Sequence, residues 1–336
     1  STAWFLARKG VSVALCEKGH IAGEQSGRNW GWVRKQGRDV RELPIMIESL
    51  AIWRELAGNI GADVGFTEGG CLFAASDEKE LAGFERWLGT AKEYGLDTRL
   101  LSADEIKGLL PESAANWAGG LLTQSDGRAE PHLAAPAIAR AAASEGAHVL
   151  TGCAVRGLDI ERGRVAGVVT EHGRIRASQV LCAAGAWTAT FCRSLDIPLP
   201  QLRVRGTVAR TAPAADILDC NVFDTRLGIR KRHDGGYTVA PGEILDHPVT
   251  PSSFRWFMKF LPAVIEQRDI VKLSFGKPFF EELLAPRRWS MDAVSPFEET
   301  RVLNPEPGKR SLKAMRRDLG KVFPAPVSYT HLTLPT

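Results

Sequence analysis

The sequence of 336 residues lacks the features that mark disulfide-rich, membrane-spanning or metal-binding proteins. Its six cysteines form no CxxC pair and are too sparse for a secreted scaffold, so we expect reduced, mostly buried thiols and a cytoplasmic location. No stretch approaches the roughly 18 to 20 apolar residues that cross a bilayer. The seven histidines are scattered, and neither GxSxG nor HExxH occurs. We therefore predict no metal site and no transmembrane segment.

A strong excess of one charge is also missing. The chain has 43 Lys and Arg against 39 Asp and Glu, and a net charge of +4 is too small to predict a nucleic-acid partner. The densest basic run, GKRSLKAMRRDLGK at residues 308–321, has helical spacing and is interpreted as a solvated helix face. A composition of 44% hydrophobic and 24% charged residues is typical of a globular protein with about two domains.

Helix signals are clearest in the first half of the chain. A helix at residues 1–10 precedes a short apolar strand, VSVALC, which is typical of the second half of a βαβ unit. Further helices are predicted at about 42–57, around 81–91, and at 131–145 before Gly146. Ser102 and Glu105 predict a capping box that opens a short helix, which Pro111 ends.

Strand signals dominate the second half of the chain. A meander is predicted at 154–161, 164–171 and 174–177, with turns at Gly163 and Gly173. The apolar segment at 179–187, QVLCAAGAW, predicts a fully buried strand of the parallel type. Alternating strands are expected at 202–211, 227–232 and 237–242, with a helix at 254–261 and a strand starting at 272.

Glu17 closes the strand VSVALC, at the position where a dinucleotide-binding fold holds the ribose hydroxyls of adenosine. An acidic residue at a strand end is equally consistent with a solvated surface glutamate. The glycine-rich phosphate loop that would accompany such an acid should lie just upstream of Ser1.

Several segments, taken in order, resemble the FAD-dependent amino-acid oxidase and dehydrogenase family, which includes D-amino-acid oxidase, glycine oxidase, sarcosine oxidase and D-amino-acid dehydrogenase. The segments are STAWFLARKGVSVALCEKG, GEQSGRNWGW, DGRAEPHLAAPAIARAAASEGAHVLTGCAV and VLCAAGAWT. The resemblance implies an α/β fold, in which a Rossmann-like FAD-binding domain is interleaved with an α+β substrate domain built on an antiparallel sheet. The FAD domain would comprise residues 1–41 and 129–200, the substrate domain 42–128 and 201–300, and residues 301–325 would begin the return to the FAD domain.

The resemblance also implies which residues hold FAD. Glu17 would bind the adenosine ribose, with Lys18 near the adenine, and Val155 would present its backbone to the adenine. The other implied contacts to the pyrophosphate, ribityl group and flavin are Gln25, Ser26, Gly27, Arg28, Asn29, Trp30, Gly31, Ala183, Ala184, Gly185 and Trp187. Plain core packing is the alternative role for Trp30, Trp32 and Trp187.

The implied reaction transfers a hydride from a small amine or amino acid to the flavin and gives an imine, with oxygen or a quinone as the electron acceptor. No protein side chain is expected to act as a catalytic acid or base. An arginine would clamp the substrate carboxylate, with Arg230 as the first candidate and Arg232 and Trp32 as further substrate-binding residues. Alternation places Arg230 and Arg232 on one face of their strand, opposite Lys231, although a solvent-facing strand arginine is the alternative for either.

The chain departs from the family pattern at both ends. The phosphate loop and the later glycine-rich loop with its Arg-Pro motif are absent, and residues 326–336 resemble translated vector or adapter sequence. We therefore expect a fragment that does not hold FAD tightly. A flavin-dependent 2-hydroxy-acid oxidase of the same fold and a non-catalytic dinucleotide-binding remnant are the alternative functions. A nicotinamide enzyme would need two nucleotide folds, and one is present.

Overall fold

A computed structural model describes residues 1–242, 244–268 and 270–324, and the suspected tail at 326–336 lies outside these residues. The chain divides into two compact units, each built from three separate segments. Unit 1 comprises Ser1–Gly27, Ile138–Arg205 and Leu245–Pro305, and unit 2 comprises Arg28–Ala137, Gly206–Ile244 and Glu306–Thr336. The domain boundaries expected from the sequence remain predictions.

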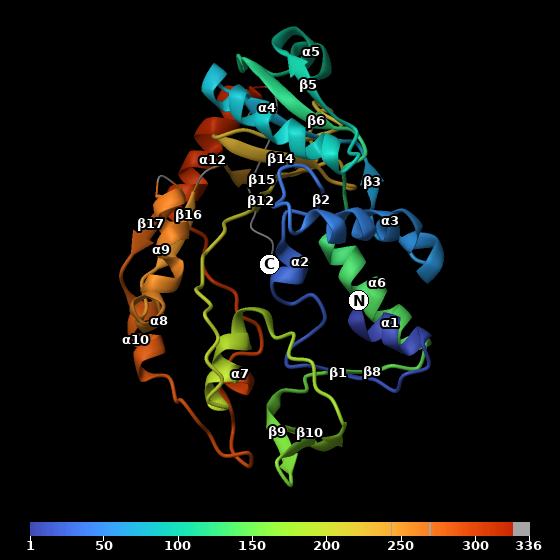
Figure 1. Cartoon of the computed structure of the whole chain (residues 1–336), viewed down its shortest axis with the longest axis vertical. Coiled ribbons are helices and arrows are strands. Elements are labelled where there is room, and N and C mark those ends of the chain that lie inside the picture. Colours follow the sequence, from blue (N-terminus) through green and yellow to red (C-terminus); the bar gives the residue numbers. More distant parts are fainter. Residues whose placement is uncertain (243, 269, 325–336) are drawn as a thin grey trace. The chain divides into compact units, whose positions relative to one another are not determined.

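Unit 1 contains a parallel pair of strands, β1 (Ala14–Glu17) and β8 (His148–Thr151), which lie side by side in Figure 1. The helix α1 (Thr2–Arg8) precedes β1, and α6 (Pro131–Ser144), which begins in unit 2, precedes β8. The predicted meander is confirmed as β9 (Val155–Glu161), β10 (Arg164–Thr170) and β11 (Gly173–Arg176), an antiparallel sheet. Positive φ angles at Gly163 and Gly173 explain why glycine occupies both turns.

The rest of unit 1 is mainly helical. Its elements are η1 (Gly185–Trp187), α7 (Thr188–Ser194), β16 (Leu245–Pro248), α8 (Pro251–Arg255), α9 (Phe257–Glu266), β17 (Val271–Ser274), α10 (Lys277–Leu284) and α11 (Pro296–Glu299). A small core forms where Trp187 and Phe191 pack with Phe297. The single helix expected at 254–261 is two helices, because Trp256 ends α8 in a non-helical conformation.

Unit 2 is built on a seven-stranded sheet in the order β12-β15-β14-β13-β4-β6-β5. The strands are β4 (Cys71–Ala75), β5 (Thr98–Ser102), β6 (Gly119–Thr123), β12 (Ala209–Arg210), β13 (Asn221–Phe223), β14 (Leu227–Lys231) and β15 (Tyr237–Pro241). All neighbours are antiparallel except β4 and β13. A smaller sheet joins β2 (Trp32–Val33), β7 (Gly127–Arg128) and β3 (Thr67–Glu68).

The described part of unit 2 also contains α3 (Leu43–Ile60), α4 (Glu78–Glu93), α5 (Ala103–Leu109), the first half of α6 and α12 (Lys309–Val322). Figure 1 shows α4 across β5 and β6 and α12 beside β14 and β15. α12 buries apolar side chains such as Met315 and Leu319 in the main core and leaves its basic side chains exposed. The interpretation of the basic run as a solvated helix face is therefore confirmed.

One strand prediction is wrong. The segment at 179–184 forms no strand among the described residues, and Val180 and Leu181 are 37% and 69% exposed. A buried strand needs neighbouring strands to satisfy its backbone groups, and no described strand pairs with this segment. The strand expected at 202–211 is likewise reduced to the two residues of β12.

Candidate functional site

Glu17 ends β1 at the carboxyl end of the parallel strand pair, where ligands bind in open α/β sheets. Its backbone carbonyl accepts the amide N–H of Cys153 at 2.9 Å. Its carboxylate Oε1 accepts the N–H of Gly19 at 2.8 Å, which fixes the orientation of the side chain. Glu17, which is predicted to bind the ribose, thus presents a half-buried, oriented carboxylate at the expected edge of the sheet.

Lys18 lies beside Glu17 but is held by protein groups. Its ammonium donates to Glu24 Oε1 at 2.8 Å and to the carbonyls of Thr300 and Arg301 at 2.7 and 2.9 Å. An ammonium has three N–H donors, and these contacts use all of them. The structure therefore gives Lys18 a role in joining two parts of unit 1.

The predicted cofactor loop, Gln25 to Gly31, begins with one helical turn, α2 (Gln25–Arg28). Gln25, Ser26 and Asn29 are exposed, and the Asn29 side chain accepts the N–H of Gly31 at 2.7 Å. Gly31 has a φ of +76°, and a Cβ there would lie 2.7 Å from the guanidinium of Arg230. Only glycine suits both the backbone angle and this close approach.

The second predicted cofactor segment, Ala183 to Gly185, is exposed and built from small residues. Gly185 has a φ of +52°, and a Cβ at this position would meet no atom within 4 Å. Val155, the first residue of β9, is half-buried. These residues leave an open surface, in contrast to the buried strand that their apolar sequence suggests.

The tryptophans that were predicted to contact FAD or the substrate lie in packed environments. Trp187 is 9% exposed and its ring meets that of Phe297 at 5.8 Å, so core packing is at least part of its role. In unit 2, Trp30 and Trp32 form an edge-to-face pair at 5.4 Å. The ring of Trp30 lies so close to Gly228 on β14 that a Cβ there would be 2.6 Å from it.

Arg230 and Arg232 are both buried, at 2% and 6% exposure, so the solvent-facing alternative is wrong for both. Lys231, between them, lies on the opposite face of the strand, as the alternation predicted. Its ammonium pairs with Asp216 and Asp219. Arg232 donates to the carbonyl of Thr211 and pairs with the adjacent Asp234.

Arg230 forms a bidentate ion pair with Glu130, a residue that sequence reasoning missed. Nη1 and Nη2 donate to the two carboxylate oxygens of Glu130 at 2.7 and 3.1 Å. Nε donates to the carbonyl of Trp30, and Nη1 also donates to that of Lys231. Four of the five guanidinium donors thus serve the protein itself. The weak signal for Glu130 was its position directly before Pro131, the first residue of α6.

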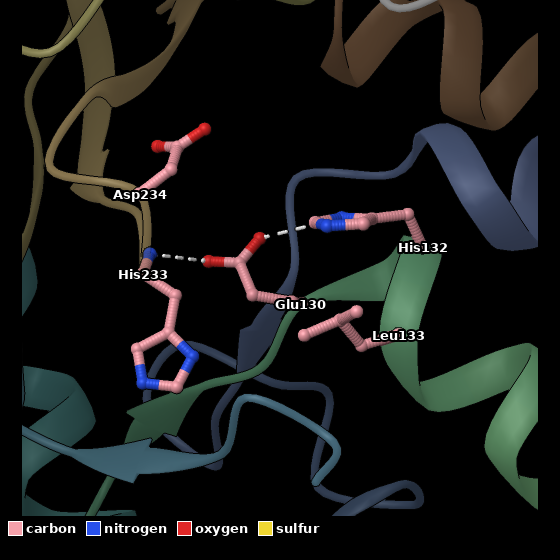
Figure 2. A pocket seen from close by; sticks show the side chains of 5 residues that line it. All are labelled: Glu130, His132, Leu133, His233 and Asp234. Carbon is pink, nitrogen blue, oxygen red and sulfur yellow. Dashed lines mark hydrogen bonds and ion pairs between the residues drawn. The ribbon is translucent and has the colours of Figure 1, made fainter.

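Glu130 and His233 belong to a pocket of about 380 Å³ that is further lined by His132, Leu133 and Asp234 (Figure 2). Figure 2 shows the Glu130 carboxylate between the His132 ring and the backbone N–H of His233, at 3.7 and 3.1 Å. A second pocket of about 150 Å³ shares Glu130 and His233 and adds the basic residues Arg128, Lys231 and Arg232. Both pockets lie within unit 2.

The charge states in the pocket follow from its surroundings. Burial raises the pKa of Glu130, but the hydrogen bonds and charge of Arg230 outweigh it, so this pKa lies below its ordinary value. Burial lowers the pKa of His132, and the nearby Glu130 offsets this only in part. At neutral pH the pocket therefore presents an ionised carboxylate beside an uncharged imidazole, which can accept a proton.

Other chemistries receive no support from the described residues. Between residues 1 and 324, with the two gaps, no group of three His, Cys, Asp or Glu side chains could hold a metal ion. Within the same residues, every helix is too short or too polar to cross a bilayer.

The chain matches the family model described as FAD dependent oxidoreductase over residues 1–288. It is 32% identical to the mitochondrial sarcosine dehydrogenase of Homo sapiens over 71% of this chain and 28% of that protein. It is 28% identical to a D-amino acid dehydrogenase of Bradyrhizobium diazoefficiens, over 61% of this chain and 54% of that one. The chain thus spans between about a quarter and a half of these relatives.

Solved structures extend the likeness to nearly the whole chain. An L-amino acid deaminase from Proteus myxofaciens, solved in complex with anthranilate, has a TM-score of 0.93 and 30% identity, covering 99% of this chain and 75% of that one. A glycine oxidase from Bacillus cereus, at 23% identity and a TM-score of 0.66, shares the fold. The predicted fold class, a flavin-binding domain with an antiparallel substrate sheet, is confirmed by these matches.

Proposed function

Because the chain belongs to the family of FAD-dependent oxidoreductases, we propose that it is part of an enzyme that oxidises a small amine or amino acid. FAD, when bound, would accept the hydride from the substrate carbon that carries the nitrogen. Three relatives between 28 and 32% identical are named for sarcosine, D-amino acids and L-amino acids, which supports an amine donor. The electron acceptor would be oxygen or a quinone.

The residues of unit 1 fit FAD. An oriented carboxylate, Glu17, lies at the carboxyl end of a parallel strand, where it could bind ribose hydroxyls. The exposed segment from Ala183 to Gly185 has room for a closely approaching group. Covering its exposed apolar neighbours, Val180 and Leu181, would contribute about 25 cal/mol of binding free energy for each Å² of apolar surface that the cofactor removes from water. We assign the adenosine ribose to Glu17 and the flexible central part of FAD to this segment and to residues 25–27, where the loop after Glu24 begins.

The observation that carries the proposal is the charged pocket of unit 2. A volume of about 380 Å³ admits a small molecule, and its lining of carboxylates and imidazoles suits a charged substrate. Within it, Glu130 offers an ionised oxygen to an ammonium, while Arg230 holds that carboxylate in place. We therefore propose this pocket as the substrate site, with Arg230 acting through its pair with Glu130.

A substrate panel tests this function. The full chain would be loaded with FAD, and binding measured by quenching of flavin fluorescence. Anaerobic mixing with sarcosine, D- and L-amino acids, proline and 2-hydroxy acids should then bleach the visible flavin absorbance with at least one amine. A chain that binds no FAD even when FAD is in large excess, or bound FAD that no amine bleaches, would contradict the proposal.

Oxidation of an alcohol is the second candidate. A relative named as the A1 subunit of anaerobic glycerol-3-phosphate dehydrogenase, from Haloferax volcanii, is 30% identical over 54% of this chain and 33% of that protein. Adding glycerol 3-phosphate to the panel separates the two functions. Bleaching by this compound or by hydroxy acids, without bleaching by amines, would favour alcohol oxidation as the reaction.

A further inference from the structure

Three distant segments of unit 1 meet at the carboxylate of Glu24. Its Oε1 accepts from the Lys18 ammonium at 2.8 Å, from the Trp187 indole N–H at 3.0 Å and from the Leu303 amide at 2.9 Å. The latter two donors lie 163 and 279 residues away in sequence. One side chain thus joins the loop after β1, the start of α7 and the chain that follows α11.

Lys18 reinforces the same junction. Besides its bond to Glu24, its ammonium binds the carbonyls of Thr300 and Arg301 and lies 4.5 Å from the centre of the Trp187 ring. A Cβ at Gly19 would lie 2.5 Å from the Arg301 carbonyl oxygen, so the two chains pass each other closely. The geometry leaves room for no larger residue at position 19.

The charge of Glu24 is matched to these donors. Burial raises its pKa, but the hydrogen bonds from Lys18, Leu303 and Trp187 together outweigh this, and its pKa lies below the ordinary value. The side chain is 24% exposed, so solvent screens the junction only in part. At neutral pH the carboxylate is ionised, and its hydrogen bonds to Lys18 and Trp187 are charge-assisted.

Two of the joined segments lead directly into the surfaces assigned to FAD. The stretch at 25–27 starts at the residue after Glu24, and the open segment at 183–185 ends two residues before Trp187. We propose that Glu24 is a positioning residue for FAD, which holds these two surfaces in the arrangement that the cofactor requires. The inference rests on the cofactor of the family and on its assigned place in unit 1, and it is independent of the substrate.

Glu24→Gln tests the proposal with little change in shape. The amide keeps one acceptor oxygen but loses the negative charge that strengthens the bonds from Lys18, Trp187 and Leu303. We expect FAD to bind roughly tenfold more weakly or worse, the size of effect that loss of one charge-assisted hydrogen bond gives. When both proteins are measured without FAD, hydrogen exchange of the Leu303 amide should be faster in this variant than in the wild-type chain. Glu145→Gln, an exposed glutamate of the same unit, is the matched control and should change neither measurement.

Further variants keep the test decisive. Lys18→Met removes the other charge, and it should weaken FAD binding less than additively when combined with Glu24→Gln, because both act on one junction. If Glu24→Gln does not fold, Lys18→Met alone should still speed exchange at Leu303. Unchanged FAD affinity in a folded Glu24→Gln protein would overturn this inference alone, whereas absence of FAD binding by the wild-type chain would count against the proposed function as well.

Discussion

At the scale of single residues, the Arg230–Glu130 pair determines what substitutions in unit 2 can reveal. Both side chains are almost fully buried, at 2% and 3% exposure, and each is the main partner of the other. Removing one member leaves a buried charge without a partner, which costs more than the pair itself contributes. A loss of activity in a single Arg230 variant would therefore combine misfolding with any effect on substrate.

We predict that Arg230→Met lowers the free energy of unfolding by about 3 to 5 kcal/mol, because it strands the Glu130 carboxylate. Arg230→Met combined with Glu130→Gln should recover part of that loss. Urea denaturation followed by circular dichroism measures both. Lys231→Met, on the opposite face of β14, is the control and should cost no more than about 1 kcal/mol. Equal losses in the single and double variants would show that the pairing is not the cause.

Glu298 should make unit 1 sensitive to acid. The hydrogen bonds from Arg156, together with those from Ser295, lower the pKa of Glu298 to about 2, from an ordinary value of 4.5. A carboxylate with a lowered folded pKa stabilises the fold above its ordinary pKa, and this contribution is lost as the pH falls towards 2. We predict that Glu298→Gln flattens the fall of Tm between pH 5 and pH 2, whereas Glu299→Gln, its exposed neighbour, leaves the slope unchanged.

At the scale of elements, local signals were sufficient where a helix end or a turn depends on adjacent residues. The capping box of α5 is present, with Ser102 and Glu105 each accepting from the other's amide. The pairing of Arg230 with Glu130 was not predictable, because it joins residues 100 positions apart. The prediction of a buried strand was wrong at 179–184 for a related reason. The apolar character of this segment indicates that another part of the protein or a ligand can cover it, but it does not identify that group.

We predict that Ser102→Ala costs about 1 kcal/mol of stability, because the amide of Glu105 loses its acceptor at the start of α5. The midpoint of urea unfolding should fall with no change in the slope of the transition. Lys107→Ala, an exposed substitution in the same helix, tests whether any change in α5 has this effect. A similar loss in both variants would remove the cap as the explanation.

At the scale of the whole molecule, the order of segments matters more than their number. The chain crosses between the two units five times, and each unit gathers strands from distant segments. In unit 2, β4 pairs with β13 in parallel, and β13 begins 146 residues after the end of β4 at Ala75, in another segment. Composition and length predicted two domains but could not show this interleaving, which became an expectation only through the family resemblance.

Interleaving predicts that a continuous piece of unit 2 will not fold alone. Residues 28–137 contain β4, β5 and β6 of the main sheet but lack β12, β13, β14 and β15, so β4 would expose an unpaired edge and most of the main core would be missing. We expect this piece to show poor dispersion in its proton NMR spectrum and no cooperative unfolding. A chain that links 28–137, 206–244 and 306–324 through Gly-Ser linkers restores all seven strands and α12, and should unfold in one transition. A well-dispersed spectrum from 28–137 alone would show that its three strands of the main sheet suffice and that the interleaved segments only add to an independent core.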